Sequence, residues 1–258
     1  MTALAAAPAG RFGERAATLD RLEVHVFDRF GDPPESAVAL RDRLVAENDR
    51  VVRELRDSIR AGRFELDAFL REAGPPGRGY DALDLLVQGV MDAGPLSPEQ
   101  REREPEMVSY QPTPARAVIE LARALGPDDV LCDLGAGLGR VVILSALLTK
   151  ARAIGVEVEP SYCEYARRCV RELNLARVEM ICADAREAPL GEANVFFMFT
   201  PFRGAILRRV LDRLAGEARA RPISVCTFGG VAAEVGREPW LKAERNDPEG
   251  IAVFRSAR

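Results

Sequence analysis

The stretch 128–140, DDVLCDLGAGLGR, limits what this chain can fold into more than any other part of the sequence. Its apolar run 130–132 is typical of a short buried strand, and Asp133 follows at the end of that run. A glycine-rich turn comes next, and the apolar residues 141–148 predict a helix after the turn. In a strand–turn–helix unit of this kind, glycine lets the backbone come close to a ligand, and the first helical N–H groups point toward it. The stretch therefore predicts a cradle for a nucleotide-like ligand.

The spacing of Gly135, Gly137 and Gly139 narrows the choice of ligand. The dinucleotide fingerprint G-x-G-x-x-G needs its third glycine at the position that Arg140 occupies here. Asp133, just ahead of the turn, would also repel a pyrophosphate. A ligand that carries cationic groups and no phosphate fits better, and S-adenosylmethionine, with its ammonium and sulfonium, is such a ligand.

Two stretches of the sequence resemble a known family. DLGAGLG resembles motif I of the class I S-adenosylmethionine-dependent methyltransferases. DLGAGLGRVVILSA, followed by GVEVEPSYCEYA, resembles the non-SET lysine methyltransferases and their bacterial relatives. The resemblance covers roughly residues 110–258 and implies S-adenosylmethionine as the cofactor. The cofactor roles are carried over here but the histone substrate is not, because this acidic chain has no basic tail for a nucleosome.

Strand and helix patterns alternate after residue 128. Strands are expected at 129–134, 153–158, 178–183, 194–200, 223–228, 240–245 and 251–255, and helices at 115–125, 138–149, 160–173 and 202–218. This alternation implies a parallel sheet with right-handed crossovers, and the last two strands form a hairpin. The expected fold class is α/β: a Rossmann-like, seven-stranded, mostly parallel sheet with a C-terminal antiparallel hairpin, preceded by an α-helical N-terminal segment.

The sequence predicts two domains, a helical accessory or lid segment at 1–109 and a class I methyltransferase domain at 110–258. Ser36 is a candidate N-cap for one long amphipathic helix that ends near 61–62. The apolar stripe of this helix consists of Leu40, Leu44, Val51, Leu55 and Ile59. The stripe is expected to pack against the main domain. The alternative is a helix that binds a partner, and an exposed stripe would allow a homodimer.

Three other N-terminal segments have simpler interpretations. Residues 1–15 are expected to be a mobile start, and 80–91 a second amphipathic helix. The charge run 101–106 is expected to be a solvated linker.

Acidic residues follow the second and third expected strands, as Asp133 follows the first. Ligands of open α/β sheets lie at the carboxyl ends of the strands, so these acids should meet at one site. Glu157 can accept hydrogen bonds from both ribose hydroxyls, and Glu159, further along, is its rival for that role. Glu157 is favoured because G-V-E-V-E-P resembles the family pattern.

The resemblance implies the remaining cofactor contacts. Asp184 would accept from the adenine amino group, Ala185 would donate its backbone N–H, and Asp133 would hold the methionine ammonium. Helix capping is the alternative role for both Asp133 and Asp184. The other candidate cofactor-binding residues are Gly135, Ala136, Gly137, Gly139 and Thr113.

The loop Tyr110-Gln111-Pro112-Thr113-Pro114 is held extended by its two prolines. It is either a connector or, as in many class I methyltransferases, a segment that lies over the cofactor and the acceptor. Tyr110 is accordingly a candidate catalytic residue.

The end of the fourth expected strand, Phe199-Thr200-Pro201-Phe202, partly resembles the N/D-P-P-Y/F motif of amino-directed methyltransferases. Phe199 replaces the polar first residue of that motif, which speaks against a nucleobase or a glutamine amide as acceptor. Thr200, Pro201 and Phe202 are candidate catalytic residues, because the carbonyls of 199 and 200 can orient an amine and Phe202 can wall the acceptor. The alternative is that Thr200-Pro201 only caps the next helix.

Composition and charge exclude several classes of protein. The formal net charge of -4 gives no overall field that attracts nucleic acid or an anionic membrane. The 5 cysteines form no C-x-x-C pair, which favours reduced thiols, and no metal is expected. No apolar run approaches the ~18 residues that span a bilayer, and the alanine-rich start lacks the features of a signal peptide. We therefore expect a cytoplasmic protein.

The chemistry favours a nitrogen acceptor. A neutral amine needs only desolvation and orientation, whereas a hydroxyl or a protonated lysine needs a base, and His25 is the only histidine. The expected function is methyl transfer from S-adenosylmethionine to an unidentified acceptor, a small molecule or a protein side chain. One alternative is a non-catalytic cofactor-binding scaffold. The other is an NAD-dependent oxidoreductase, against which Arg140 and Asp133 argue.

Overall fold

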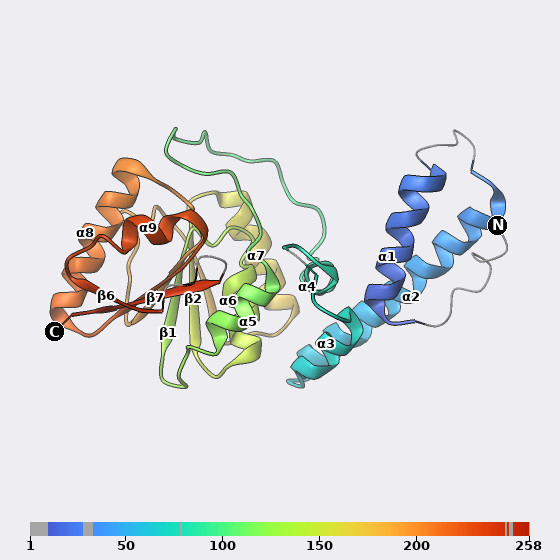
Figure 1. Ribbon diagram of the computed structural model, residues 1–258, viewed down its shortest axis with the longest axis horizontal. Coiled ribbons are helices and arrows are strands. Elements are labelled where there is room, and N and C mark those ends of the chain that lie inside the picture. Colours follow the sequence, from blue (N-terminus) through green and yellow to red (C-terminus); the bar gives the residue numbers. More distant parts are fainter. Residues whose placement is uncertain (1–9, 28–32, 78, 246, 248–249, 258) are drawn as a thin grey trace. The chain divides into compact units, whose positions relative to one another are not determined.

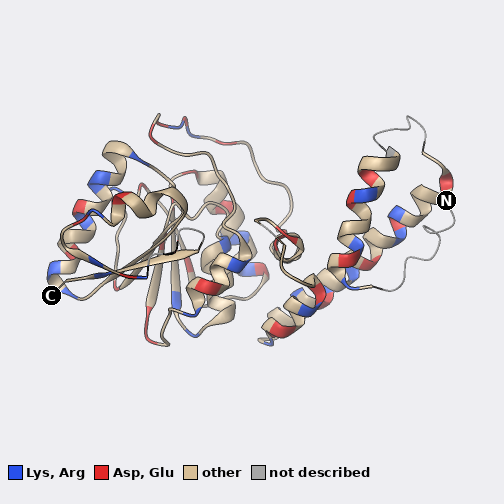
Figure 2. Ribbon diagram, viewed as in Figure 1, with Lys and Arg blue, Asp and Glu red and all other residues tan. Residues whose placement is uncertain are grey.

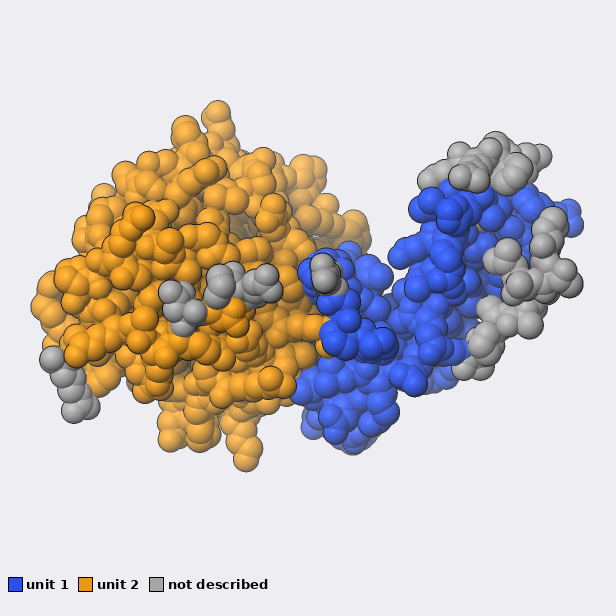
Figure 3. Space-filling model, viewed as in Figure 1, with its two compact units in different colours: residues 1–92 blue, residues 93–258 orange. Residues whose placement is uncertain are grey.

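The computed structural model describes residues 10–27, 33–77, 79–245, 247 and 250–257. The chain forms two compact units, Met1–Asp92 and Ala93–Arg258 (Figure 3). The two compact units divide after Asp92, earlier in the chain than the domain boundary expected between residues 109 and 110. The reason is that the residues after Asp92 already bond to the second unit, as in the 3.0 Å hydrogen bond from the Val108 N–H to the Pro201 carbonyl.

The second unit is built around a seven-stranded sheet with the strand order β3-β2-β1-β4-β5-β7-β6. Its strands are β1 Val130–Leu134, β2 Arg152–Glu157, β3 Val178–Cys182, β4 Val195–Met198, β5 Ser224–Phe228, β6 Leu241–Arg245 and β7 Ile251–Ser256. β1 to β5 pair in parallel, and β7 is antiparallel to both β5 and β6. The predicted fold class is confirmed. The strand order reverses between β1 and β4, which is where such sheets bind their ligands.

Helices cover both faces of this sheet. α5 Ala115–Ala122, α6 Arg140–Leu148 and α7 Pro160–Glu172 lie on one face, and α8 Gly204–Ala220 and α9 Ala232–Val235 lie on the other (Figure 1). The four longer helices agree with the sequence pattern to within a few residues. The short turn η2 Gly229–Val231 and α9 were not predicted, because segments of three and four residues carry no period that a pattern can reveal.

The side chains of β1 alternate between these two layers of helices. Cys132 and Leu134 belong to the core that contains Phe196 of β4 and Leu214 of α8. Both neighbours of Cys132, Leu131 and Asp133, are buried as well. All five residues of β1 are buried. A parallel strand that is covered on both faces is expected to have a nearly continuous apolar sequence, as β1 does.

The first unit consists of α1 Phe12–Leu22, η1 Glu23–Phe27, α2 Glu35–Arg60, α3 Leu66–Ala73 and α4 Ala82–Val90. The predicted helices at 36–60 and 80–91 are confirmed. The mobile start predicted for 1–15 is wrong from Phe12 onward, because the helix α1 begins there and buries Phe12 and Leu22; residues 1–9 lie outside the described residues. The prediction that Ser36 is the N-cap is also wrong, because α2 begins at Glu35 and Pro34 holds the N-cap position.

The apolar stripe of α2 is covered within the first unit. Leu40 and Leu44 are buried against Leu22 of α1, and Val51 and Ile59 are buried too. Leu40 and Leu44 are therefore covered by α1 of the same unit, while Leu55 of the stripe is half-buried. The rest of α2 carries acidic and basic side chains interspersed along its length (Figure 2). Among the described helices, none combines the length and the hydrophobicity needed to cross a bilayer.

Phe196 provides a test of the core. Replacing this fully buried side chain by alanine removes contacts from the middle of the sheet, so Phe196→Ala should lower the free energy of unfolding by about 3–5 kcal/mol. Urea unfolding followed by circular dichroism measures the loss. Leu96→Ala, at an exposed position of the same unit, should change stability by less than about 0.5 kcal/mol. Equal effects of the two variants would contradict the assigned core.

Candidate functional site

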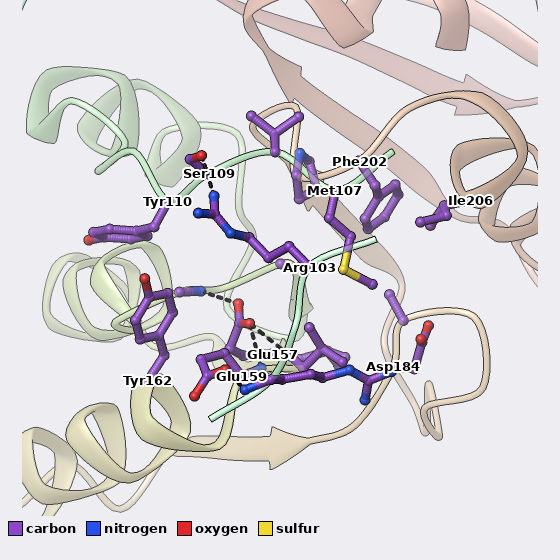
Figure 4. A pocket seen from close by; sticks show the side chains of 18 of the residues that line it. Arg103, Met107, Ser109, Tyr110, Glu157, Glu159, Tyr162, Asp184, Phe202 and Ile206 are labelled. Carbon is purple, nitrogen blue, oxygen red and sulfur yellow. Dashed lines mark hydrogen bonds between the residues drawn. The ribbon is translucent and has the colours of Figure 1, made fainter. Parts of the chain in front are cut away.

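A pocket lies at the carboxyl ends of β1, β2 and β4 (Figure 4). Residues 99–111, here called the strap, form one of its walls. The predicted site residues that line the pocket are Tyr110, Gly135, Gly137, Glu157, Asp184, Ala185, Pro201 and Phe202. The predicted residues that do not line it are Thr113, Asp133, Ala136, Gly139 and Thr200. The strand ends therefore bring most of the predicted residues together.

The side chains of Pro201 and Tyr110 pack closely against the glycine turn after β1. A methyl group built on Gly135 would lie 2.2 Å from Cβ of Pro201, and one on Gly137 would lie 2.4 Å from the ring of Tyr110. Both glycines also have positive φ angles, +87° and +53°. The turn is held against the next strand because the N–H groups of Gly135 and Ala136 donate to the Val156 carbonyl at 2.9 and 3.0 Å. A side chain at Gly135 would therefore clash with Pro201, and one at Gly137 would clash with Tyr110.

Glu157 is tied to the turn by its own carboxylate. One oxygen accepts from the Gly137 N–H at 2.8 Å, and the other accepts from the N–H groups of Val158 and Glu159 at 2.8 and 2.9 Å. Burial raises the pKa of Glu157, and these three hydrogen bonds oppose that rise. The side chain thus occupies a fixed position on the pocket wall (Figure 4).

Asp133 is a buried acid without a counter-charge. Its carboxyl is 3% exposed, and none of the described residues donates a hydrogen bond to it. Burial, and secondarily the charge of Glu157, raises the pKa of Asp133 to about 8. The capping alternative is wrong, because the N-cap of α6 is Gly139. A cation placed beside a buried carboxyl group of this kind stabilises its ionised form.

Asp184 lies at the end of β3 in an ion-pair network. Its two oxygens accept from Nε and Nη2 of Arg186 at 3.0 and 2.7 Å, and Oδ1 also accepts from the Arg186 backbone N–H at 2.8 Å. Arg186 lowers the pKa of Asp184 and pairs with Glu104 of the strap as well. The capping alternative for Asp184 is wrong, because the described residues between β3 and β4 form a turn and no helix, and Asp184 lies on the pocket wall. The next residue, Ala185, contributes to the same wall.

Glu159, the rival of Glu157, has a different set of partners. Its carboxylate caps α7 by accepting from the N–H and the hydroxyl of Ser161, at 3.0 and 2.7 Å. The same carboxylate accepts from the strap N–H groups of Gln100 and Arg101 at 2.9 and 3.0 Å. Burial opposes its ionisation, but these hydrogen bonds together hold the pKa of Glu159 below its ordinary value.

The other end of the strap is fixed beside α8. Glu106 accepts from the N–H groups of Ala205 and Ile206 at 2.9 and 3.1 Å, which lowers its pKa. Met107 pairs with Phe202 through an antiparallel bridge. The solvated linker expected at 101–106 is therefore wrong, because backbone and carboxylate groups on both sides of that run bond to the sheet unit.

The aromatic residues of the strap region pack at the pocket. The rings of Tyr110 and Tyr162 meet edge to face at 5.5 Å, and the Tyr162 hydroxyl donates to Glu99 at 2.5 Å (Figure 4). Thr113, two residues before α5, is 6% exposed and stays outside the pocket wall.

The residues after β4 form the opposite wall. Phe202 is buried beside Met107 and Ile206 (Figure 4). Thr200 has a φ of +43°, an uncommon value for a side chain branched at Cβ. The capping alternative for Thr200-Pro201 is wrong, because Arg203 is the N-cap of α8 and the first N–H groups of that helix bond to Glu106.

Sequence reasoning missed the strap contacts of Glu106 and Glu159. The one usable signal was the position of Glu159 at the start of α7, where an acid predicts a cap. The part of the chain that the structure describes contains no cluster of three or more potential metal ligands. The five cysteines are free thiols, four of them buried.

Asp133 provides a test through pH. Its folded-state pKa of about 8 lies above the ordinary value of about 3.9, so the native state keeps a proton that the unfolded chain releases. The stability that this proton contributes is complete below about pH 4 and is lost as pH rises toward 8. Asp133→Asn should therefore gain stability relative to the natural protein between pH 5 and 8 in urea unfolding. Asp128→Asn, at an exposed acid, is the control, and a pH-independent difference for Asp133→Asn would contradict the raised pKa.

Comparison with known proteins agrees with this geometry. Residues 131–218 match the family model described as a methyltransferase domain. A protein-lysine N-methyltransferase of Saccharolobus islandicus (strain REY15A) is 31% identical over 97 residues, which cover 36% of this chain and 60% of that relative. The chain thus matches less than two thirds of the length of that relative.

Solved structures of methyltransferases also resemble the chain. An RNA methyltransferase from Salinibacter ruber, in complex with S-adenosyl-L-homocysteine, is 29% identical with a TM-score of 0.43, covering 57% of this chain and 92% of that one. A methyltransferase from Geobacter sulfurreducens is 20% identical with a TM-score of 0.42, covering 55% and 78%. The family match lies within the unit Ala93–Arg258 and extends from β1 into α8, so this unit resembles a methyltransferase domain.

Proposed function

We propose that this chain transfers a methyl group from S-adenosylmethionine to a nitrogen acceptor, and that the amine of a lysine side chain in a protein is the first acceptor to test. The observation that supports this most strongly is the pair of buried acids at the ends of adjacent strands. Asp133 has no cation among the described residues, and Glu157 is fixed beside the glycine turn. A ligand with an ammonium group and neighbouring ribose hydroxyls matches both needs.

The residues of the pocket fit this cofactor. In the proposed arrangement Glu157 accepts the ribose hydroxyls, and Asp133, which is buried and does not line the pocket itself, holds the ammonium group directly or through water. Gly135 and Gly137 both line the pocket, and Pro201 and Tyr110 pack against them, so a cofactor bound at this turn would contact its backbone beside these two side chains. Asp184 and Ala185 are proposed to contact the adenine. Asp184 would do so while bonded to Arg186, since a carboxylate oxygen can accept more than one hydrogen bond.

The bound cofactor supplies a methyl group on a sulfonium, and its displacement in line leaves a neutral thioether. The role of the protein is to align the nucleophile with the sulfonium methyl group and to exclude water. Such alignment can lower the activation free energy by up to about 7–11 kcal/mol. Tyr110 on the strap and the residues after β4 are proposed to do this. The Pro201 carbonyl accepts from the Val108 N–H, so we assign the orientation of an amine to the carbonyls of Phe199 and Thr200.

An amine acceptor is supported by the titratable groups. His25, the only histidine, lies in η1 of the first unit. A lysine ammonium must first give its proton to water or another base, and the deprotonated amine then attacks the methyl group without a base in the transfer step itself. The name of the curated relative, a protein-lysine N-methyltransferase, supports a lysine acceptor. The net charge of -4 and the interspersed charges in Figure 2 give no support to a nucleic acid.

The acceptor class is tested with methyl-labelled S-adenosylmethionine added to the purified protein and a lysate of its source. Label in protein, removed by digestion to amino acids and recovered as methyl-lysine, is the expected result. Label only in small molecules would overturn the protein acceptor. No transfer to any fraction, by a protein that binds S-adenosylhomocysteine tightly, would support the scaffold alternative instead.

The ribose contact is tested with Glu157→Ala. Loss of charged hydrogen bonds should weaken binding of S-adenosylhomocysteine by about 1.5–3 kcal/mol in isothermal titration calorimetry. Glu157→Gln keeps the shape of the side chain and separates the loss of charge from a collapse of the turn. Glu164→Ala, at an exposed site on α7, should bind normally. An affinity of Glu157→Ala equal to that of the natural protein would remove Glu157 from the proposed site.

A further inference from the structure

Two carboxylates that have no role in the proposed cofactor contacts fix the strap on either side of the pocket. Glu159 holds its beginning to the first turn of α7. Glu106 holds its other side to the first turn of α8. Since α7 follows β2 and α8 follows β4, the strap passes over the strand ends between them.

Four residues after Glu106, the strap touches the glycine turn directly. A methyl group on Gly137 would meet the ring of Tyr110 at 2.4 Å, so the ring covers the backbone of the glycine turn. Tyr110 in turn packs on Tyr162, whose hydroxyl donates to Glu99 near the start of the strap. A ligand bound against the turn would therefore be in contact with Tyr110.

Glu159 is the more buried of the two carboxylates that hold the strap. It is 6% exposed, and its two oxygens divide the contacts. Oε1 accepts from Ser161 and from Gln100, while Oε2 accepts from Arg101. One side chain thus joins the strap to the first turn of α7, in surroundings that water screens poorly.

Glu159 is also connected to the proposed ribose ligand. Its backbone N–H donates to Oε1 of Glu157 at 2.9 Å, so the two acids belong to one hydrogen-bonded segment at the end of β2. A shift of this segment would move the strap and the Glu157 carboxylate together.

We propose that Glu159 is a positioning residue that keeps the strap closed over the bound cofactor and so sets how fast the cofactor leaves. It acts through Gln100 and Arg101 and does not touch the reacting atoms. This inference rests on the proposed function, because it takes the ligand under the strap to be S-adenosylmethionine or its product.

The test is Glu159→Asp. Aspartate is a good helix N-cap, so α7 keeps its cap, but the side chain is one methylene group shorter and loses the strap N–H groups. Losing two hydrogen bonds to a charged group should speed release of S-adenosylhomocysteine about tenfold or more, as measured by stopped flow. The KM for S-adenosylmethionine should rise more than kcat falls, and the unfolding midpoint should change little.

A second readout needs neither cofactor nor acceptor. Trypsin can cut after Arg101 and Arg103, and mass spectrometry of a brief digest should show these cuts accelerated in Glu159→Asp. Glu164→Asp makes the same chemical change at an exposed position of α7 and should behave like the natural protein in both assays. Glu159→Gln keeps the length but presents an amide N–H to the strap, and it should show the same direction of change.

A folded Glu159→Asp protein with natural rates of release and of cleavage would overturn the inference. The two proposals fail in different ways. If the natural protein binds no S-adenosylhomocysteine, the proposed function fails, and faster cleavage in Glu159→Asp still reports that Glu159 holds the strap. If binding is normal and neither rate changes, only the role of Glu159 fails.

Discussion

The hydrogen bond from the Gly137 N–H to the Glu157 carboxylate is the contact on which the rest of the site depends. It joins the glycine turn after β1 to the end of β2, and so fixes two neighbouring strand ends in one arrangement. It also keeps the charge of Glu157 close enough to Asp133 to raise the pKa of that buried acid. The domain thus holds two acids close together without a cation among the described residues. A cationic ligand would reduce the repulsion between the two carboxylates.

The strap extends the same arrangement outward. Residues 157–159 carry three successive functions: the side chain of Glu157 holds the turn, the backbone of Glu159 holds Glu157, and the side chain of Glu159 holds the strap. Binding surface and cover are therefore built from one short segment of backbone. On the other side of the pocket, Glu106 and Val108 connect the strap to the loop after β4.

The sheet could be predicted from the sequence because buried parallel strands and the helices between them have clear periods, and the glycine spacing indicated where they begin. The strap could not, because it has no period and its partners lie far along the chain; Arg101 and Glu159 are 58 residues apart. The alternating charges of the strap are typical of a solvated surface. Only the three-dimensional structure shows that Glu106 lies at the start of α8. The capping roles considered for Ser36 and for Thr200-Pro201 were wrong because a nearby residue holds the N-cap position instead. Pro34 is the N-cap of α2, and Arg203 is the N-cap of α8.

The packing of Tyr110 on Tyr162 has a spectroscopic consequence. The chain has 1 tryptophan and 4 tyrosines, and two of the tyrosines meet at the pocket. Trp240 lies elsewhere, beside β6 at the edge of the sheet, where its indole N–H donates to Glu238. Tryptophan emission therefore reports on the hairpin edge. The tyrosine absorbance includes the pair at the pocket together with Tyr80 and Tyr165, so a change in tyrosine absorbance without a change in tryptophan emission arises away from that edge.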